Sequence, residues 1–497
     1  MTHRWAAGVM LGTILLILAA CGGSSTPSPT ALPSVTAAAP TATAAPTLEP
    51  PSTEPAVTAT AAPVDAPTTE RISSSDAVVD FWTSDNEPKR VAVYRTLAER
   101  YMAEHPGVVV NVVPYVESTT LQQLEAAEAA GELPDLIRVG IEWVAALDGA
   151  DLLDPQAAAA VVQAVGEADF REGVLPMVTD SASGELLAVP YDGWIQALWY
   201  RRDRFEQLGL KTPISWADLS QACDTIEAGG DPAFALVLPT VGNQNYVHQV
   251  FEQVAMSNNA WPFDAGGNVT MNTAEMVEAL RFYTSLQRCS PAAPQDIYGA
   301  RERYLRDESA MLFYSTYIMD DLLEGSESAD GRKIEIAVEN LPGKTGFTSS
   351  LAGPNGVASY GQLVTLALLD GASPVAQDVA RFFLQEGYLD ILATAPLGKV
   401  PVLESALEPW GNSSPVFQAY SPATLGHIVN GYTMIKRWVL RTEYNRAQKA
   451  TIGAIEARLI IPQVIEQIVA GDLTPEMAAQ QLQAQVETLY NIRKTGG

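Results

Sequence analysis

The 497-residue sequence contains few of the residues on which catalytic and metal sites usually depend. It has four histidines and three cysteines, and none stands in an H-E-x-x-H, H-x-x-E-H or C-x-x-C pattern. The G-x-S-x-G motif of serine hydrolases does not occur. Gly343-Lys344-Thr345 is similar to the end of a phosphate-binding loop, but Val338 stands where that loop needs its first glycine. We therefore expect no catalytic residue, no metal and no cofactor, and we interpret the protein as a non-enzyme.

Basic residues are also scarce. Lys and Arg total 30 against 58 Asp and Glu, which leaves a formal net charge of −28. Such an acidic chain repels nucleic acid and anionic lipid, and no basic run offers a footprint for either. We expect no nucleic-acid partner. The many carboxylates leave one enzyme class open, because a glycoside hydrolase needs only two of them at a suitable separation.

Long apolar runs are limited to the N-terminus, where His3 and Arg4 precede an apolar stretch over residues 9–20. The stretch is too short for an ordinary membrane span and is typical of a secretory signal. Its end, Leu18-Ala19-Ala20-Cys21-Gly22, resembles a bacterial lipobox. The resemblance implies that residues 1–20 are a signal peptide, and that Cys21 is lipidated and anchors the protein on the extracytoplasmic side of the cell membrane. The alternative is a plain signal peptide with an incidental cysteine.

Residues 21–75 lack large apolar side chains almost entirely and consist mainly of Ser, Thr, Pro, Ala and Gly. A segment of this composition cannot bury enough apolar surface to offset the entropy of ordering. We expect a disordered tether between Cys21 and a globular part that begins near residue 76.

The globular part, about 420 residues, is larger than a single core usually grows, so we expect two lobes. Strand patterns at 77–82, 108–113 and 135–139 alternate with two helical patterns. The first follows a polar loop over residues 83–89 and stops at Pro106-Gly107, and the second covers residues 121–130. This alternation predicts an α/β fold with a mainly parallel sheet. Ligands of open parallel sheets bind at the carboxyl ends of the strands, which indicates the loops after Trp82 and Val139.

Two cysteines remain after Cys21. Outside the cell Cys223 and Cys289 can form a disulfide, but two buried thiols are an equal alternative.

Aromatic residues in predicted loops and at strand ends lie next to polar ones. Glu142 adjoins Trp143 and Asp192 precedes Trp194, while Asn86 and Glu87 follow the first strand. Sugar rings pack against aromatic faces, and their hydroxyl groups need carboxylate or amide partners. The pattern therefore favours a carbohydrate ligand, although each aromatic residue also fits a role in the core.

Eight motifs, in order, carry a resemblance to a known family. The first half of the set comprises Val79-Asp80-Phe81-Trp82, His105-Pro106-Gly107-Val108, Gly131-Glu132-Leu133-Pro134-Asp135, and the turn over residues 149–155. The second half comprises the segment 184–205 (GELLAVPYDGWIQALWYRRDRF), Trp216-Ala217-Asp218-Leu219, Gly398-Lys399-Val400-Pro401, and Leu473-Thr474-Pro475-Glu476. With them the chain resembles the extracellular solute-binding proteins of family 1, the maltose-binding-like lipoproteins of ABC importers.

The resemblance implies a two-lobed periplasmic-binding-protein-like fold of type II with a mostly helical C-terminal region. It implies lobe 1 at 76–189, lobe 2 at 190–335, a return to lobe 1 at 336–375 and a helical part of lobe 2 at 376–497. It also implies that both lobes supply ligand-binding residues. The expected residues are Asn86, Glu87, Glu142, Trp143, Asp192, Trp194, Trp261, Tyr314, Tyr317 and Tyr432. Glu87 and Trp194 depart from the maltose-binding pattern and argue against maltose itself.

We accordingly predict a monomeric solute-binding lipoprotein that captures a carbohydrate and delivers it to the permease subunits of an ABC importer. Three alternatives stay open: a polyamine, peptide or phosphodiester bound by the same fold, a secreted glycoside hydrolase, and a sensor that presents its ligand to a membrane receptor.

Overall fold

The computed structural model describes residues 77–328 and 331–495. The predicted signal peptide, Cys21 and the tether lie outside these residues. In the described part, no helix is both long enough and apolar enough to cross a membrane.

Lobe 1 is built on the three parallel strands that the sequence pattern predicts. β1 (Ala77–Thr83) pairs with β2 (Val108–Pro114) on one side and with β3 (Leu136–Gly140) on the other. Helix α1 (Pro88–Glu104) connects the first two strands and begins with proline, whose fixed φ angle suits the first helical position. Helix α2 (Thr120–Ala130) ends at Gly131, which has a left-handed φ of 69°.

The remaining elements of lobe 1 cover this sheet or extend it. They are η1 (Glu117–Thr119), α3 (Ile141–Asp148), α4 (Pro155–Val165), η2 (Glu167–Asp169), α5 (Val174–Met177), β12 (Gly361–Leu368), α13 (Pro374–Gln385), α14 (Tyr388–Leu392) and β13 (Val400–Pro401).

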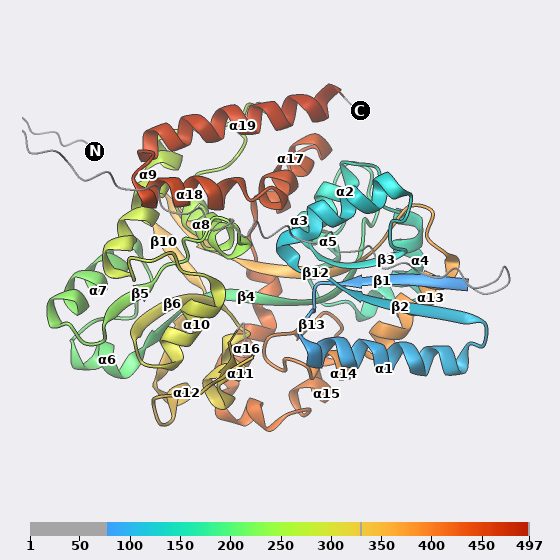
Figure 1. The fold of residues 1–497 in the computed structure, drawn as a ribbon, viewed down its shortest axis with the longest axis horizontal. Helices are drawn as coiled ribbons and strands as arrows, with labels where there is room; N and C mark the ends of the chain where they lie inside the picture. The colour runs from blue at the N-terminus through green and yellow to red at the C-terminus, as the bar shows by residue number, and fades with distance from the viewer. Residues whose placement is uncertain (1–76, 329–330, 496–497) are drawn as a thin grey trace, which may run out of the picture. The chain divides into compact units, whose positions relative to one another are not determined.

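One long strand, β4 (Val189–Arg201), belongs to both lobes. Its first half pairs with β12 and β13 of lobe 1, and its second half pairs with β6 and β9 of lobe 2. The strand order is β2-β1-β3-β12-β4-β6-β5, and Figure 1 shows β4 and β12 running through the middle of the fold. Both β12 pairings and the β4–β6 pairing are antiparallel, so the sheet is mixed where a mainly parallel one was predicted. Pairing direction depends on which distant strand returns to the sheet, and β12 returns from far along the chain.

Lobe 2 surrounds the second half of β4. Its elements up to residue 359 are α6 (Arg202–Gln207), α7 (Trp216–Gly229), β5 (Phe234–Val237), α8 (Asn245–Ser257), α9 (Ala274–Ser285), η3 (Leu286–Cys289), α10 (Ile297–Leu305), β6 (Ser309–Ser315), α11 (Ile318–Glu324), β7 (Ser326–Glu327), β8 (Lys333–Ile334), α12 (Leu341–Lys344), β9 (Thr345–Thr348), β10 (Ser350–Gly353) and β11 (Gly356–Ser359). Cys223 of α7 and Cys289 of η3 form a disulfide in this lobe.

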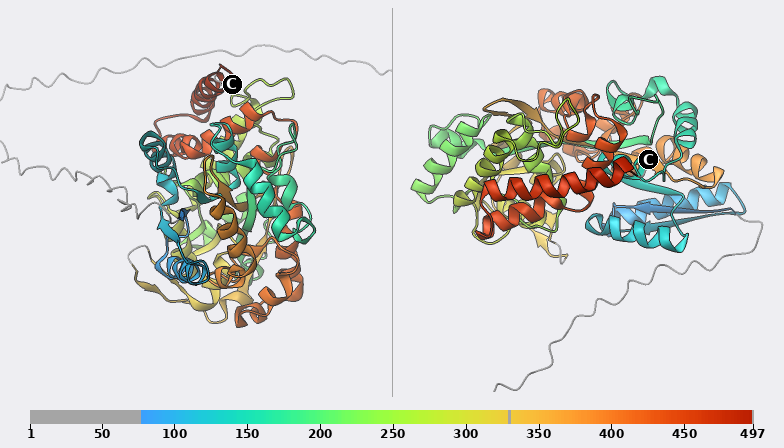
Figure 2. Two further views of the ribbon diagram at one scale, coloured as in Figure 1. Left: turned by 90° about the vertical axis from the view of Figure 1, so that its right-hand side faces the viewer. Right: turned by 90° about the horizontal axis from the view of Figure 1, so that it is seen from above.

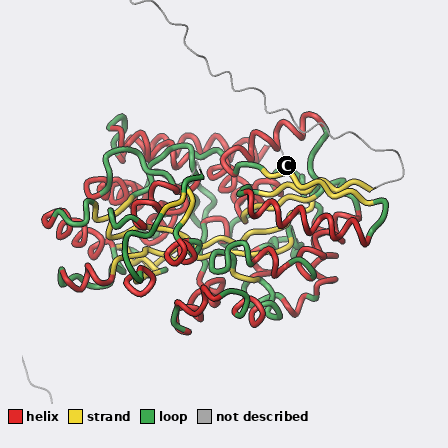
Figure 3. Tube along the Cα trace, turned by 60° about the horizontal axis from the view of Figure 1, so that its bottom comes forward, coloured by secondary structure: helices red, strands yellow, loops and turns green. Residues whose placement is uncertain are grey.

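The C-terminal region is helical, as predicted (Figures 2 and 3). Its elements are α15 (Leu407–Gly411), η4 (Pro415–Ala419), α16 (Pro422–Val429), η5 (Asn430–Met434), η6 (Trp438–Leu440), α17 (Arg446–Ala457), α18 (Ile460–Ala470) and α19 (Pro475–Thr495). Helices α18 and α19 pack on α8 and α9 of lobe 2, whereas α17 also packs on α3 of lobe 1.

The predicted division of the chain between the lobes needs two corrections. Strand β9 pairs with the lobe 2 half of β4, and β10 and β11 contact α8, so the return to lobe 1 begins at Gly361 and not at residue 336. The sequence also assigned residues 376–401 to lobe 2, but α14 packs against α1 and β13 pairs with the lobe 1 half of β4. Helix α13, in the same predicted part of lobe 2, packs against α1, α4 and β1 of lobe 1. Its Phe383 ring lies 5.1 Å from that of Phe81. An apolar helix face is visible in the sequence, but the lobe that covers it is not.

Three segments pass side by side between the lobes, and we call them the hinge segments: residues 194–196, 359–362 and 435–437. The Gln196 backbone N–H donates to Tyr360 O at 2.9 Å, and that of Lys436 donates to Ser359 O at 3.3 Å. A Cβ atom at Gly361 would lie 2.7 Å from both Trp194 O and Ile435 Cγ1. Glycine at this position therefore allows the three segments to approach one another.

Candidate functional site

The loop after β1 buries the side chain of Asp85 and leaves Asn86 and Glu87 at least partly exposed. The backbone N–H of Asp85 donates to Thr83 Oγ1 at 3.1 Å, which turns the Asp85 carboxylate inward, where it is 3% exposed. Asn86 is exposed, and half-buried Glu87 pairs with Arg90 at 3.4 Å. Sequence analysis singled out Asn86 and Glu87 but missed Asp85.

Asp85 belongs to a buried group that we call the inner charge cluster: Asp85, Arg138 of β3, Asp192 of β4, and Lys399 just before β13. Lys399 Nζ lies 2.6 Å from Asp85 Oδ2 and 3.7 Å from Asp192 Oδ2. Arg138 Nη2 donates to both Asp192 oxygens, at 3.1 and 2.8 Å. Four separate chain segments thus meet at the carboxyl ends of β1 and β3, the edge at which parallel sheets bind ligands.

The inner charge cluster is electrically balanced, with two carboxylates and two cations. Burial by itself would raise the pKa of Asp85, but Arg138, Lys399 and Arg90 outweigh it and hold that pKa well below its usual range. Burial, together with Arg138, lowers the pKa of Lys399. Asp192, a predicted ligand residue, is fully buried and has protein partners on both oxygens.

Lobe 2 approaches this edge through the loop after β6. The guanidinium carbon of Arg90, in lobe 1, lies 5.1 Å from the centre of the Tyr317 ring. The same ring covers Gly398, where a Cβ atom would lie 2.4 Å from Tyr317 Cδ1. Tyr317 is therefore a predicted residue that contacts the opposite lobe directly.

Carboxylates follow Tyr317 on α11. Asp321 pairs with Arg301 of α10 at 3.3 Å, and burial raises the pKa of Asp321 to about 6. Burial also raises the pKa of Asp320 to about 7, although the backbone N–H of Leu397 donates to its carboxylate. We use the term interlobe face for Glu87, Arg90, Glu117 and Glu142 of lobe 1 together with Asn245, Arg301, Tyr317 and Asp321 of lobe 2.

A second polar group, which we call the hinge relay, consists of Glu142, Gln362, Arg437, Glu456 and Asn245. Gln362 Nε2 donates to Glu142 Oε2 at 2.7 Å, and Arg437 Nη1 donates to Gln362 Oε1 at 2.8 Å. On the other side of Arg437, Nη2 donates to Glu456 Oε2 at 2.7 Å, and Asn245 Nδ2 donates to Glu456 Oε1 at 2.9 Å. Burial and the nearby Glu456 raise the pKa of Glu142 to about 7, against the opposing effect of Arg437.

Side chains with metal-ligating atoms adjoin this relay. One atom from each of His248, Glu252 and Glu456 lies within 4.8 Å of the others. The arrangement does not fit a metal ion, because the Arg437 guanidinium already pairs with Glu252 at 3.2 Å and with Glu456 at 2.7 Å. Two of the three possible ligands thus already have a cationic partner.

The other predicted aromatic residues differ in their surroundings. Trp143 and Tyr314 are 6% and 5% exposed, and Tyr432 donates from its hydroxyl to Val400 O at 2.6 Å. These three pack mainly within protein. Half-buried Trp194 lies on a hinge segment, with its ring 6.0 Å from that of Tyr360.

Trp261 lies apart from the others. Its Nε1 donates to Asn259 Oδ1, and the Arg441 guanidinium carbon lies 4.3 Å from its ring. Over residues 77–328 and 331–495, no hydrogen bond, ion pair or ring contact joins Trp261 to the inner charge cluster or the hinge relay.

Sequence reasoning missed most of the polar residues of the two groups. These are buried Asp85, Arg138, Gln362, Arg437 and Glu456, and half-buried Asn245. Lys399 was noticed only as part of the Gly398–Pro401 motif. A signal existed for Arg138, since a charged residue inside an apolar strand usually has a buried partner.

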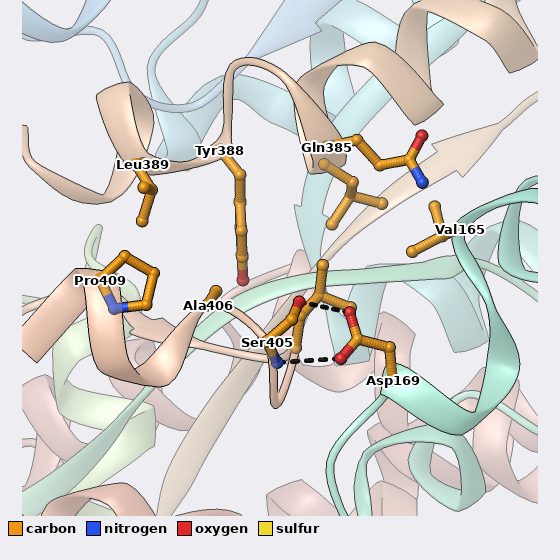
Figure 4. Close-up of a pocket in the computed structure, with 10 residues that line it drawn as sticks. Val165, Asp169, Gln385, Tyr388, Leu389, Ser405, Ala406 and Pro409 are labelled. Carbon is orange, nitrogen blue, oxygen red and sulfur yellow. Dashed lines mark hydrogen bonds between the residues drawn. The ribbon is translucent and has the colours of Figure 1, made fainter.

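Two cavities lie away from these groups. One of about 280 Å³ is lined by α14 and the loop before α15, where Ser405 donates to Asp169 from its backbone and its hydroxyl (Figure 4). The other, about 570 Å³, lies between α3 and α5 on one side and η6 and α17 on the other. Neither is lined by a residue predicted to bind ligand.

Two lobes joined by three adjacent segments, with polar groups gathered where the lobes meet, define the class of two-lobed binding proteins. The bacterial extracellular solute-binding protein family matches residues 84–388. The chain belongs to this family, as its sequence resemblance implied.

Curated relatives agree with this assignment, and solved structures share the fold. YcjN of Escherichia coli (strain K12), named as an ABC transporter periplasmic-binding protein, is 28% identical over 63% of this chain and 69% of its own length. The lactose-binding protein of Rhizobium radiobacter is 31% identical over 24% of this chain and 28% of its own. T. maritima MalE3, solved with maltose, superposes with a TM-score of 0.64 at 20% identity, over 83% of this chain and all of that one. An Arthrobacter chlorophenolicus sugar transporter protein, solved with laminaribiose, has a TM-score of 0.66 at 17% identity, over 83% and 99%.

Proposed function

We propose that this protein captures a carbohydrate between its two lobes and delivers it to the membrane permease of an ABC importer. The observation that carries the proposal is the contact between Arg90 of lobe 1 and Tyr317 of lobe 2, 5.1 Å apart. It brings the first turn of α1, directly after the loop that follows β1, against the loop after β6 at the carboxyl edge of the parallel strands. Closure of hinged lobes around a solute is the motion by which such proteins bind.

The chemistry at the interlobe face suits a sugar. Tyr317 is a partly exposed ring on this face, and Glu87, Glu117 and Asp321 are carboxylates that can accept from hydroxyl groups. Trp194, on the first hinge segment, is a second partly exposed ring. The lactose-binding relative and the structures solved with maltose and laminaribiose support the same ligand class.

The charge balance disfavours a phosphodiester. Arg90 pairs with Asp85 and Glu87, and Arg301 pairs with Asp321 at 3.3 Å. An anionic ligand would have to displace these carboxylates, whereas the hydroxyl groups of a neutral sugar can bind beside them. A polyamine is the competing ligand, and it is included in the test below.

Lipidated Cys21 would hold the protein at the extracytoplasmic surface, close to its permease, and two or more acyl chains give stable anchoring. The protein would act as a monomer, bind without turnover and need no cofactor.

The proposal is tested by mass spectrometry of ligand retained through native purification, followed by thermal unfolding with a panel of sugars and with spermidine. A ligand at 100 times its Kd stabilises the fold by about 2.7 kcal/mol, which raises Tm measurably. We expect a shift with one class of mono- or oligosaccharide. A shift with spermidine alone, or with none of these compounds, would overturn the sugar assignment.

Two tryptophans provide a matched pair for this experiment. Both are half-buried, but Trp194 lies on a hinge segment and Trp261 packs against Arg441. We expect Trp194→Ala to weaken sugar binding at least tenfold and Trp261→Ala to leave it within twofold. Equal losses in the two variants would contradict a ligand contact at Trp194.

A further inference from the structure

The hinge relay is a continuous chain of hydrogen bonds that begins in one lobe and ends in the other. Glu142 stands in the first turn of α3 in lobe 1, and Asn245 is the first residue of α8 in lobe 2. Four hydrogen bonds of 2.7 to 2.9 Å connect them through Gln362, Arg437 and Glu456. Arg437 is the middle member, and it lies on a hinge segment.

Each end of the relay carries a buried acceptor that has no partner. Within the described residues, Glu142 Oε1 and Asn245 Oδ1 make no hydrogen bond, although neither atom is accessible to solvent. A buried acceptor is normally satisfied, because its desolvation is otherwise uncompensated. The inner members differ, since both oxygens of Glu456 and both polar atoms of Gln362 are engaged. The acceptor atoms without a hydrogen-bond partner thus lie only at the two ends of the relay.

The two ends lie near one point on the interlobe face. Desolvation of the Glu117 carboxyl group and the nearby Glu142 raise its pKa, whereas Arg138 and a hydrogen bond with the Asn245 side chain lower it, so the Glu117 carboxyl group lies near Glu142 and Asn245. Glu117 as a residue is nevertheless exposed to solvent, so it lies at the edge of the face with its carboxyl group turned inward. The buried acceptors therefore adjoin a residue that a solute can reach.

Local packing fixes the Glu142 end. A Cβ atom on Gly140 would lie 2.4 Å from both Glu142 Oε1 and Gln362 Nε2, so only glycine leaves room for the carboxylate to fold back over the end of β3. That strand end is where a parallel sheet binds its ligand.

Packing fixes Arg437 as well. Its guanidinium carbon lies 4.4 Å from the Tyr360 ring centre, and its Nε pairs with Glu252 at 3.2 Å. Because the Arg437 guanidinium is held on several sides, it fixes the positions of the Gln362 and Glu456 side chains to which it donates.

We propose that Glu142 Oε1 and Asn245 Oδ1 accept hydrogen bonds from two hydroxyl groups of the solute, one from each lobe, and that Arg437 is the positioning residue that holds both acceptors. This inference rests on the proposed sugar-binding function. It predicts that the ligand carries two hydroxyl donors, one for each lobe. It also predicts that the hinge relay couples binding of the ligand at Glu142 to binding of the ligand at Asn245.

The test compares two buried glutamines at the hinge. Gln362 is a relay member, whereas Gln253 donates to Ser349 O and Ala358 O outside the relay. Calorimetric titration of the full-length protein would use maltose, lactose, laminaribiose, ribitol and D-mannitol as probes. For the probe that binds most tightly, we expect Gln362→Leu and Arg437→Met each to reduce affinity by about tenfold or more, the usual effect of one lost charge-assisted hydrogen bond. We expect Gln253→Leu to stay within twofold.

The pH dependence separates positioning from a merely structural role. The ionised Glu142 carboxylate is the better acceptor, so wild-type affinity should rise with pH through about 7. Glu456, Arg437, Glu117 and the Gln362 amide all face this carboxylate. Arg437 lowers the pKa of Glu142, so Arg437→Met should move the rise in affinity to higher pH. Arg437→Lys keeps a positive charge and should bring the rise part of the way back to the wild-type pH. General damage to the fold would lower the sugar affinity without changing the pH at which the affinity rises.

The possible results distinguish failure of the relay from failure of the sugar-binding function. Unchanged affinity in Arg437→Met, or an equal loss in Gln253→Leu, overturns the relay while leaving the sugar-binding function intact. If the wild-type protein binds none of the probes and retains no sugar on purification, the proposed function fails and the relay fails with it.

Discussion

Lys399 donates from Nζ to Oδ2 of Asp85 at 2.6 Å, although 314 positions separate the two residues in the chain. Both side chains are buried, and Asp192 and Arg138 complete the group. This pairing joins the segment before β13 to the loop after β1, so the binding edge of lobe 1 depends on a residue from far along the sequence.

Removing the Lys399 charge should destabilise the fold. Lys399→Met leaves Asp85 and Asp192 with one buried cation fewer, and breaking a buried ion pair typically costs about 3 kcal/mol. Urea unfolding at pH 7 measures the loss. Lys89→Met is the control, because exposed Lys89 lies 3.9 Å from Glu87, and surface pairs contribute at most about 1 kcal/mol. Equal effects in the two variants would contradict a structural role for the cluster.

Low pH should destabilise the fold through the inner charge cluster as well. The pKa of Asp85 is held below its unfolded-state value, so its contribution to stability is present above about pH 4 and is lost as pH falls further. Lys399→Met removes one of the cations that lower this pKa. We expect the acid-unfolding midpoint of the variant, followed by circular dichroism, to move towards neutral pH.

Glu142 should affect stability with the opposite sign. Its pKa is raised to about 7, so the native state binds this proton more tightly than the unfolded state does. The stability contribution is therefore full below about pH 4.5 and declines as pH rises through 7, by up to about 3 kcal/mol. Glu142→Gln should flatten the fall in unfolding free energy between pH 5 and pH 8, while Glu125→Gln, at an exposed position, should not. A slope that is unchanged in Glu142→Gln would refute this assignment.

The Cys223–Cys289 disulfide joins α7 to η3 across 66 positions. A loop of that size corresponds to about 4 kcal/mol of stabilisation in the chain-entropy model. We expect the double variant Cys223→Ala/Cys289→Ala to unfold at a lower urea concentration and to bind sugar with unchanged affinity, since the bond lies within lobe 2. Unaltered unfolding of the wild-type protein after reduction would argue against the bond.

Tyr317 should contribute to closure through its ring. Arg90 lies over this ring, and a cation–π contact contributes about 1 kcal/mol. Tyr317→Phe retains the ring, so sugar affinity should stay within twofold of wild type. Tyr317→Leu removes it and should lower affinity about fivefold in calorimetric titration. A loss in Tyr317→Phe as large as in Tyr317→Leu would assign the effect to the hydroxyl group.

Local pattern was enough for the first part of the fold. The apolar runs of β1, β2 and β3 and the glycine after α2 act over a few residues, and the structure has these elements where the sequence predicts them. Helix α1 begins at Pro88, inside the segment that the sequence predicts as a loop. The helical C-terminal region followed from the same short-range periodicity.

The sequence by itself determined the class of fold, the family and the strand edge at which the predicted loops lie, because these follow from spacing along the chain. Only the tertiary structure decided which lobe α13 covers, which strands run antiparallel and which charges are buried together. The partner of Asp85 comes from the residue before β13, and that of Glu142 comes from the third hinge segment, each hundreds of residues away in the chain. A buried charge is stabilised by neighbours in space, and local sequence carries no record of which neighbours those are.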